Sequence, residues 1–210
     1  MRSIKELINL QNRTAMITGA NGSIGKQIVK TIAELGGSLI LVDKPGTDYS
    51  ELKIDKDISK VSSIEYIECD LEDEQSRVNL INKIIENRSE LSILINNAAF
   101  VGDSDLKGWT TDFSNQSGKT WRRALEVNLT AAFDLSKGLL PLLKKNNNGS
   151  IINIASTYGV VGPDYSLYEG TEMGNPAAYA ASKGGLIQLT RWLSTTVAPD
   201  VRVNTISPGG

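Results

Sequence analysis

The sequence predicts an α/β fold in which a doubly wound parallel sheet is covered by helices on both faces. Short apolar runs alternate along the chain with longer segments of helical periodicity, as in a sheet built by helical crossovers. The runs are apolar almost throughout, which is typical of strands that are buried on both faces. The length of 210 residues, with 40% apolar and 22% charged side chains, suits a single domain over residues 1–210 with a full core.

The individual elements follow from periodicity and from the turn residues between them. Ile24, Ile28, Ile32 and Leu35 recur at helical spacing and predict the buried face of the first helix. Ligands bind such sheets beyond the carboxyl ends of the strands, so the residues that directly follow each strand are candidates for function. Strands are expected at 14–18, 38–42, 64–68, 91–95, 150–155 and 201–206, and helices at 24–36, 73–88, 118–143 and 176–197.

Composition excludes several classes of chemistry. The chain has no histidine, which excludes Ser-His-Asp and Cys-His mechanisms and removes the commonest zinc ligand, so we expect no metal. A net charge of −2 without a basic stripe argues against a nucleic-acid partner. The single Cys69 and the lack of a long apolar run favour a cytoplasmic protein without a membrane segment. Acid–base chemistry must then come from tyrosine, lysine, cysteine or a carboxylate.

A glycine-rich turn, TGANGSIG, joins the first predicted strand to the first predicted helix. Glycines there permit a tight turn and let backbone N–H groups approach a pyrophosphate at the helix N-terminus. A glycine loop by itself is a weak signal, but its place between a strand and a helix is typical of a dinucleotide-binding loop. The cofactor contacts predicted in this turn are Gly19, Asn21, Gly22, Ser23, Ile24 and Gly25.

Two acids end the next predicted strands. Asp43 closes LILVD, where a carboxylate would accept both hydroxyls of the adenosine ribose and repel a 2′-phosphate. We therefore expect NAD(H) to be preferred, while the adjacent Lys44 leaves NADP(H) open as an alternative. Asp70 follows the third predicted strand and is expected either at the adenine edge or as a helix N-cap.

Tyr179 and Lys183 lie four residues apart on the last predicted helix, so their side chains share one face. A nearby ammonium favours the phenolate form of a tyrosine, whose usual pKa is about 10, and so makes it usable in acid–base catalysis. A surface pair is the ordinary alternative at this spacing. Ser156 directly follows the fifth predicted strand, where its hydroxyl either orients a substrate oxygen or caps a turn before Gly159.

Asn128 interrupts an apolar stripe on the predicted helix 118–143. Burying an unsatisfied amide costs about 1–3 kcal/mol, so we expect its polarity to serve function or to partner an irregularity of the helix. The stripe consists of Trp121, Leu125, Ala132, Leu135 and Leu139.

Together these residues resemble the short-chain dehydrogenase/reductase family, compact subgroup, over essentially the whole chain. The motifs occur in the family's order: TGANGSIG, Asp43, Asp70-Leu71, Asn96-Asn97-Ala98-Ala99, Asn128, Ser156, Tyr179-x-x-x-Lys183 and Pro208-Gly209. The resemblance implies a Rossmann fold and an NAD(P)-dependent enzyme that interconverts a carbonyl and an alcohol. The further cofactor contacts that it implies are Asp43, Asp70, Leu71, Asn97, Ala98, Ala99, Tyr179, Lys183, Pro208 and Gly209.

The resemblance also implies a catalytic tetrad of Asn128, Ser156, Tyr179 and Lys183. Tyr179 would transfer the proton, and Lys183 would favour its phenolate and bind the nicotinamide ribose. Ser156 would hold the substrate oxygen, and Asn128 would anchor a water in the proton relay.

Three features depart from the family pattern. The spacing G-x-x-G-x-x-G, with Ser23 in place of a glycine, is similar to the extended sugar-nucleotide enzymes, and we interpret it as a local variant. The interval from Ser156 to Tyr179 is unusually long, and its extra residues are expected over the substrate pocket. The family continues beyond the position of Gly210 with a substrate-covering segment and a last strand, which we expect to be missing here.

The loops expected to face the substrate are acidic. An acidic mouth favours a polyhydroxylated or amino-bearing substrate, although solubility is the plainer explanation. The stretch YEGTEMGNPAAYAASKGG also resembles oxidoreductases of bacterial surface-sugar and flagellin-glycan pathways. We therefore expect a small, sugar-like substrate. The acidic residues are Asp103, Asp105, Asp112, Asp164, Glu169 and Glu172, with Lys107 as the one base.

Two other functions remain open. A 3-oxoacyl-carrier-protein reductase would use Arg122 and Arg123 as a small docking patch for an acidic carrier. A nucleotide-sensing scaffold on the same fold would be expected to have lost a tetrad residue, and none is lost.

The helices 118–143 and 176–197 are expected to carry more apolar surface than one sheet face needs. This surplus, like the family resemblance, predicts a homodimer or homotetramer in which these helices pair about a two-fold axis. The residues concerned are Leu129, Phe133, Leu140, Leu143, Leu186, Leu189, Trp192 and Leu193.

Overall fold

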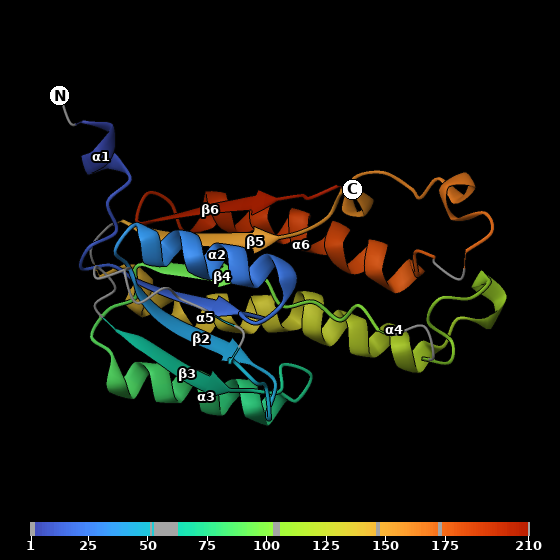
Figure 1. Cartoon of the computed structure of the whole chain (residues 1–210), viewed down its shortest axis with the longest axis horizontal. Coiled ribbons are helices and arrows are strands. Elements are labelled where there is room, and N and C mark those ends of the chain that lie inside the picture. The colour runs from blue at the N-terminus through green and yellow to red at the C-terminus, as the bar shows by residue number, and fades with distance from the viewer. Residues whose placement is uncertain are drawn as a thin grey trace.

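The predicted doubly wound sheet is confirmed in the computed structural model, which describes residues 3–50, 52, 63–102, 106–145, 148–171 and 174–209. All strand pairings are parallel, and the strand order is β3-β2-β1-β4-β5-β6 (Figure 1). The order reverses between β1 and β4, so the loops that follow these two strands diverge and leave room for a ligand. The strands are β1 (Thr14–Thr18), β2 (Ser38–Asp43), β3 (Ile64–Glu68), β4 (Ile93–Asn96), β5 (Gly149–Ile154) and β6 (Val201–Ile206).

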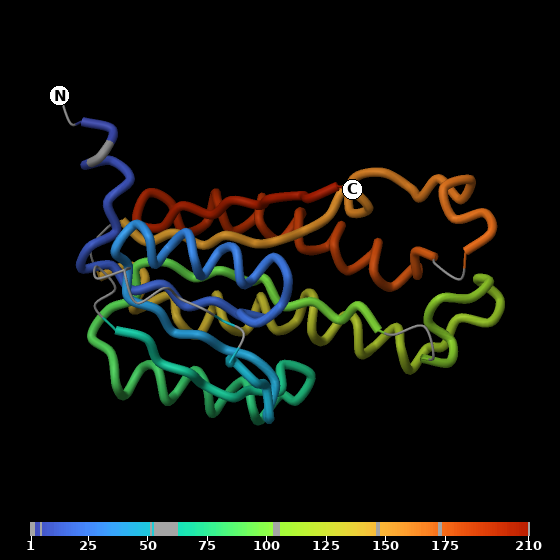
Figure 2. Tube along the Cα trace, in the orientation of Figure 1, coloured from blue at the N-terminus to red at the C-terminus, as the bar shows by residue number. Residues whose placement is uncertain are grey.

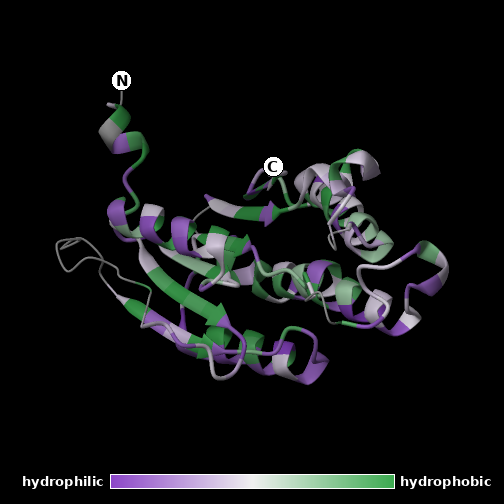
Figure 3. Ribbon diagram, turned by 45° about the vertical axis from the view of Figure 1, so that its right-hand side comes forward, coloured by the Kyte–Doolittle hydropathy of each residue, from purple (hydrophilic) through white to green (hydrophobic). Residues whose placement is uncertain are grey.

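Helices cover both faces of the sheet. Alternate residues of β1 point to opposite cores: Ala15 and Ile17 pack on α2, and Met16 packs on the core formed with α3, α5 and α6. The strands at the centre are accordingly hydrophobic in Figure 3. The helices are α1 (Ile4–Leu7), α2 (Ser23–Glu34), α3 (Glu74–Asn87), α4 (Gly118–Leu125), α5 (Ala131–Leu143) and α6 (Ala177–Thr196). In the part of the chain that the structure describes, no helix is both long and apolar enough to cross a membrane.

The predicted buried face of the first helix is wrong at its start. Ile24 is 47% exposed, whereas Val29, Ile32 and Ala33 are buried with Gly25. Ile24 lies in the first turn of α2, directly after the exposed glycine turn that follows β1. Boundaries of the strands and of the other helices otherwise differ from the predicted ones by at most two residues.

The segment 118–143 is not one regular helix. A π-helical turn over Glu126–Thr130, which contains Asn128, separates α4 from α5. Because a π turn inserts an extra residue, one unbroken stripe cannot stay buried along the whole segment. Trp121 is 40% exposed and Leu125 half-buried, so these two residues do not belong to the predicted stripe. Before the turn the buried positions are Thr120 and Ala124, within it Val127 and Asn128, and after it they include Ala132, Leu135 and Leu139.

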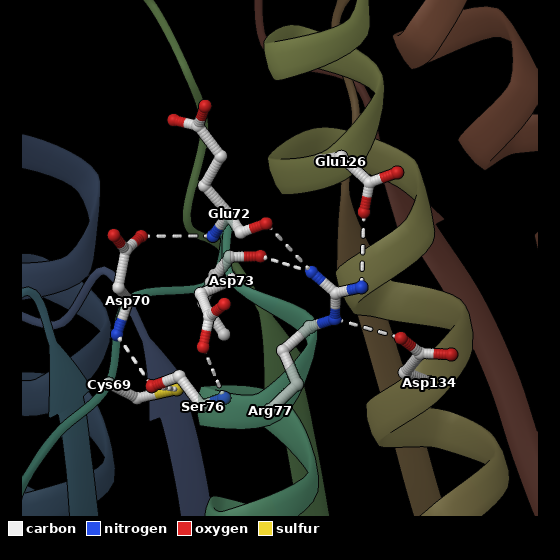
Figure 4. Close-up of polar contacts among 9 residues, drawn as sticks. Cys69, Asp70, Glu72, Asp73, Ser76, Arg77, Glu126 and Asp134 are labelled. Atoms are coloured by element: carbon white, nitrogen blue, oxygen red, sulfur yellow. Dashed lines mark hydrogen bonds and ion pairs between the residues drawn. The ribbon is translucent and has the colours of Figure 1, made fainter.

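A buried arginine fixes the π turn in place (Figure 4). Arg77 of α3 is 2% exposed and donates to Glu126 at 3.0 Å and to Asp134 at 2.8 Å, one at the start of the turn and one beyond it. The same guanidinium donates to the backbone carbonyl of Leu71 at 2.8 Å. A fully bonded guanidinium thus ties the loop after β3 to both sides of the π turn.

Two loops extend together beyond the carboxyl end of the sheet. The segments before α4 and before α6 project at the same end of the molecule (Figure 2). Gln116 joins them, because its Oε1 accepts the N–H of Ala177 at the start of α6 at 3.0 Å. Three short 3-10 turns that were not predicted shape these loops: Phe113–Asn115, Thr157–Gly159 and Tyr165–Tyr168.

Candidate active site

The glycine turn after β1 forms a cradle that side chains would fill. Gly19 has φ +62°, and a Cβ on it would lie 2.8 Å from Ala98 Cα. A Cβ on Gly25 would lie 2.1 Å from the Gly19 carbonyl oxygen, so only glycine lets α2 start this close to the turn. Gly22 caps α2 without a side-chain hydrogen bond, and Gly22, Ser23 and Ile24 are exposed. The free N–H groups of this helix end suit a pyrophosphate, so the turn fits a dinucleotide.

The segment after β4 supports this cradle. Asn97 donates from Nδ2 to the carbonyls of Thr18 and Gly19, both at 2.9 Å. The Thr18 hydroxyl in turn accepts the N–H groups of Asn97 and Ala98, both at 3.1 Å. Asn96 points into the sheet layer and donates to Asn153 of β5 at 2.8 Å. The Asn96–Ala99 stretch therefore braces the glycine turn, and Ala98 and the half-buried Ala99 lie beside it.

Asp43 lies at the end of β2 and faces the glycine turn. Its Oδ2 accepts the Asn21 N–H and its Oδ1 accepts the Lys44 N–H, both at 2.9 Å. Desolvation, followed by the negative charges of Asp43 and Glu68, raises the pKa of the nearby Tyr49 to about 12. The region where an adenosine ribose would lie is therefore negatively charged.

Asp70 and Leu71 follow β3 but play different parts. Asp70 is exposed, and its carboxylate accepts the Glu72 N–H at 3.0 Å. The alternative that Asp70 caps the next helix is wrong, because Asp73 is the N-cap of α3 and accepts the Ser76 N–H at 2.7 Å. The Leu71 side chain is buried in the core.

Lys183 is buried against the end of β5, on the same helix as Tyr179. Its Nζ donates to the Ile154 carbonyl at 2.7 Å and lies 5.7 Å from the centroid of the Tyr179 ring. The residue is 2% exposed, and burial lowers the pKa of Lys183 to about 8. Tyr179 is half-buried and lines a cavity. The predicted pair is thus not a surface pair.

Asn128 lies in the π turn, and its amide binds two other segments of the chain. Its Oδ1 accepts the Phe100 N–H at 2.6 Å, and its Nδ2 donates to Ser182 Oγ at 2.9 Å. Ser182 in turn donates to the Tyr179 carbonyl at 2.8 Å. Asn128 therefore connects the loop after β4 to the helical turn that carries Tyr179 and Lys183.

Of the two alternatives considered from the sequence for Ser156, the structure shows the turn cap. Ser156 caps the 3-10 turn Thr157–Gly159, since its Oγ accepts the Tyr158 N–H at 3.2 Å. That bond uses an oxygen lone pair and leaves the hydroxyl proton to be donated elsewhere. A Cβ on Gly159 would lie 2.7 Å from the Lys183 backbone, so glycine allows this turn to pack on α6 beside Lys183.

Pro208 and Gly209, after β6, lie beside the same turn. The Pro208 carbonyl accepts the Thr157 N–H at 3.0 Å, and a Cβ on Gly209 would meet Thr157 Cγ2 at 2.8 Å. The structure therefore brings the end of β6 next to Ser156.

A cavity of about 180 Å³ opens beside Tyr179. The hydroxyls of Tyr158 and Tyr168 form a hydrogen bond at 2.5 Å, which raises the pKa of Tyr168 to about 12. Neither Tyr158 nor Tyr168 was predicted as a site residue, although both lie in a loop that was expected to face the substrate. The lining residues are Val101, Trp109, Thr110, Tyr158, Tyr168, Gly174, Asn175, Pro176 and Tyr179.

The acidic residues of the two loops do not form this lining where the structure describes them. Asp112, Asp164 and Glu169 are exposed and are not among the lining residues. Asp164 caps the 3-10 turn Tyr165–Tyr168, and its hydrogen bonds with Ser166 lower the pKa of Asp164. Asp103, Asp105 and Glu172 lie outside the described residues.

Comparisons with known proteins agree with this geometry. Residues 13–210 match the family model described as short chain dehydrogenase. A relative named 3-oxoacyl-[acyl-carrier-protein] reductase FabG, from Rickettsia conorii, is 33% identical over 208 residues, which cover 97% of this chain and 74% of the relative. Among solved structures, a putative NAD(P)-dependent gluconate 5-dehydrogenase from Beutenbergia cavernae, with bound NADP, is 29% identical with a TM-score of 0.78, over 96% of this chain and 74% of that one. An NAD+-bound xylitol dehydrogenase is 28% identical with a TM-score of 0.76, over 95% and 71% of the two chains.

The burial of Lys183 predicts a pH-dependent stability. Below about pH 8 the folded and unfolded chains both hold the proton, and the buried ammonium destabilises the fold. Between that value and the ordinary 10.5, the folded chain loses a proton that the unfolded chain retains. The free energy of unfolding should therefore rise with pH over this window, relative to Lys183→Met, by about 2–3 kcal/mol.

Urea unfolding of the parent and Lys183→Met between about pH 7 and pH 10 measures this difference. Lys145→Met, which removes one exposed ammonium, is measured alongside as the control for loss of charge. Parallel profiles for the parent and Lys183→Met would show that Lys183 keeps its proton throughout.

Proposed function

The chain belongs to the short-chain dehydrogenases, and from this premise we propose that it interconverts a carbonyl and a secondary alcohol on a small, sugar-like substrate, with NAD(H) preferred. Membership makes it an NAD(P)-dependent oxidoreductase that acts on CH–OH or carbonyl groups. The observation that carries the proposal is that Tyr179 lines a cavity, that the buried Lys183 lies 5.7 Å from its ring, and that the turn capped by Ser156 packs on α6 beside Lys183.

Each residue of the tetrad has its own role in the reaction. The nicotinamide, when bound, supplies or accepts the hydride. Tyr179 donates its hydroxyl proton to the carbonyl oxygen during reduction and recovers one during oxidation. The ammonium of Lys183 stabilises the resulting phenolate, because the low dielectric of its buried position strengthens the attraction. Ser156 donates its hydroxyl proton, which the turn cap does not use, to the substrate oxygen. Asn128 holds the helical turn of Tyr179 in place and anchors a water for proton relay.

A sugar-like substrate suits the lining of the cavity. Tyr158, Tyr168 and Thr110 offer neutral hydroxyl groups, and Trp109 offers an apolar ring face. Alternating hydroxyls and C–H groups of a polyol match such a wall of hydroxyls and rings. Two similar structures are named for gluconate and xylitol, which are polyhydroxylated compounds.

A 3-oxoacyl-carrier-protein reductase is the second candidate, favoured by the name of the relative from Rickettsia conorii. Its proposed docking patch is weakened in the structure. Arg123 is engaged by Glu72 at 2.7 Å and lies 4.8 Å from the centroid of the Phe100 ring, which leaves Arg122 as the freely exposed cation of the pair.

The preference for NAD(H) rests on Asp43. Its carboxylate is held by two backbone N–H groups at the point where a 2′-phosphate would add negative charge. Charge repulsion and loss of the ribose hydrogen bonds both disfavour NADP(H) there.

A homo-oligomer remains part of the proposal, with a smaller contact surface than the sequence suggested. Leu143, Leu186 and Leu193 are buried inside the chain and are not surplus. Phe133 of α5 and Trp192 of α6 remain 42% and 58% exposed, and large aromatic side chains are typical of subunit contacts. Pairing of these helices with a second copy would cover them, in a dimer or a tetramer.

Replacing Tyr179 by phenylalanine should abolish turnover and leave cofactor affinity nearly unchanged. The hydroxyl serves proton transfer, and its loss is expected to lower kcat by about 10²–10⁴-fold. Turnover is followed at the nicotinamide absorbance with xylitol, gluconate and acetoacetyl-CoA as probes. Tyr165→Phe, at an exposed tyrosine outside the cavity, is the matched control and should keep parent activity. Parent-like turnover of Tyr179→Phe would show that Tyr179 does not transfer the proton.

The parent should bind NAD(H) more tightly than NADP(H), and Asp43→Asn should narrow the difference by about 10- to 100-fold, the value of a charged hydrogen bond. Isothermal titration of both cofactors measures the two affinities in the parent and in Asp43→Asn. Asp48→Asn, at an exposed acid in the same loop, controls for net charge and should leave the ratio unchanged. Equal or reversed affinities in the parent would contradict the assignment.

Sedimentation at micromolar concentration should show at least a dimer, and Trp192→Glu should shift the distribution towards monomer, because a carboxylate cannot be buried in an apolar contact without cost. Lys145→Glu, at an exposed site past the end of α5, is the matched control. A monomeric parent would defeat the proposal of a homo-oligomer.

A further inference from the structure

Asn175 is a buried amide without hydrogen-bond partners. Its side chain is 7% exposed, and neither Oδ1 nor Nδ2 has a partner. Among the buried side chains that the structure describes, it is the only amide with both ends unpartnered. Asn128 and Asn153, by contrast, use both ends of their amides. An orphan of this kind destabilises the free protein and needs an explanation.

The position of Asn175 connects this amide to the reaction. It lines the cavity together with Tyr179. It directly precedes Pro176, the N-cap of α6, whose carbonyl accepts the Tyr179 N–H at 3.0 Å. The adjacent Ala177 N–H is bound by Gln116 at 3.0 Å, so the backbone on this side of the cavity is fixed. The backbone of Asn175 is therefore held about one helical turn from that of Tyr179, and both residues line the same cavity.

Two other polar groups of the cavity, the hydroxyls of Tyr158 and Tyr168, are already paired with each other. The hydroxyls of Tyr158 and Tyr168 share one hydrogen bond at 2.5 Å, which leaves a single O–H of the pair to be donated to another group. The Asn175 amide offers a donor and an acceptor in addition. A ligand that satisfies these groups must both donate and accept close to the reacting carbon, as a hydroxyl does.

We infer that Asn175 is a specificity-determining residue that binds a hydroxyl on a carbon adjacent to the one oxidised or reduced. The substrate class is then a vicinal diol or the corresponding hydroxyketone, as in a polyol or a sugar. An alkyl segment, such as that of an acyl thioester, would leave the amide unpartnered in the complex as well. The inference rests on the proposed function and narrows its substrate.

Matched pairs of alcohols test the inference through specificity. The probes are cyclohexane-1,2-diol against cyclohexanol and butane-2,3-diol against butan-2-ol, each oxidised with NAD+. In the parent, kcat/KM should favour the diol of each pair. In Asn175→Leu the ratio of kcat/KM for the diol to kcat/KM for the mono-alcohol should fall by about 10- to 100-fold, because leucine cannot form the hydrogen bond to the second hydroxyl. An unchanged ratio would overturn the inference, whatever happens to the absolute rates.

Thermal unfolding of the free protein provides a second test that needs no turnover. Asn175→Leu removes an unpartnered amide, so its Tm should equal or exceed that of the parent. Asn153→Leu is the matched control: Asn153 is 0% exposed, and its replacement removes the buried 2.8 Å bonds that it makes with Asn96 and Thr190, so its Tm should fall by several degrees. If leucine strains the site, Asn175→Ala repeats both measurements with a smaller side chain.

The two tests separate the possible failures. A parent that oxidises none of the alcohols, xylitol or gluconate would refute the proposed reaction. A Tm of Asn175→Leu and Asn175→Ala as low as that of Asn153→Leu would show that Asn175 is structural and would refute the inference alone. A parent that oxidises the mono-alcohol of each pair as well as the diol would leave the oxidoreductase intact and refute the hydroxyl contact.

Discussion

The buried amide of Asn128 is the contact on which the site depends. It accepts the Phe100 N–H after β4 and donates to Ser182 of α6, one residue from Lys183. These bonds are geometrically possible because the helix passes through a π turn, which places an amide where an unbroken helix would place an apolar side chain. Arg77 braces that turn from α3 through Glu126 and Asp134 (Figure 4). Arg77 also holds the loop after β3, through the Leu71 carbonyl. The loop after β3 and the loop after β4, which Asn128 of the π turn binds, are therefore both connected to Arg77.

The reactive groups depend on burial at the carboxyl edge of the sheet. Lys183 reaches back under the 3-10 turn capped by Ser156 to the Ile154 carbonyl, and the lack of a side chain at Gly159 lets that turn pack closely. The low dielectric around the ammonium lowers the pKa of Lys183 and strengthens its field at the neighbouring phenol. Stability and function therefore oppose each other here, as is common where a charge is kept buried for chemistry.

The substrate side of the site differs from what the acidic composition of its loops suggested. The described acids Asp112, Asp164 and Glu169 are exposed, and the carboxylate of Asp164 caps a short turn. The residues that line the cavity carry no charge, and the polar ones among them include Tyr158, Tyr168, Thr110 and Asn175. The charged residues of these loops that the structure describes therefore face solvent, and the cavity is lined by uncharged residues. This division favours a neutral hydroxylated compound over an amino-bearing one.

The sequence by itself determined the succession of strands and helices along the chain, the glycine turn with Asp43 after it, and the Tyr179–Lys183 pair. These features depend on local periodicity and on spacing within one element, which the chain carries along its length. Only the tertiary structure decided the π turn at Asn128, the exposure of Ile24, the N-cap at Asp73 and the cavity shared by Tyr158, Tyr168 and Asn175. Each of these depends on where segments distant in the chain meet. Phe100, Ser182 and Arg77 decide the partners of the π turn, and no periodicity within residues 118–143 contains that information.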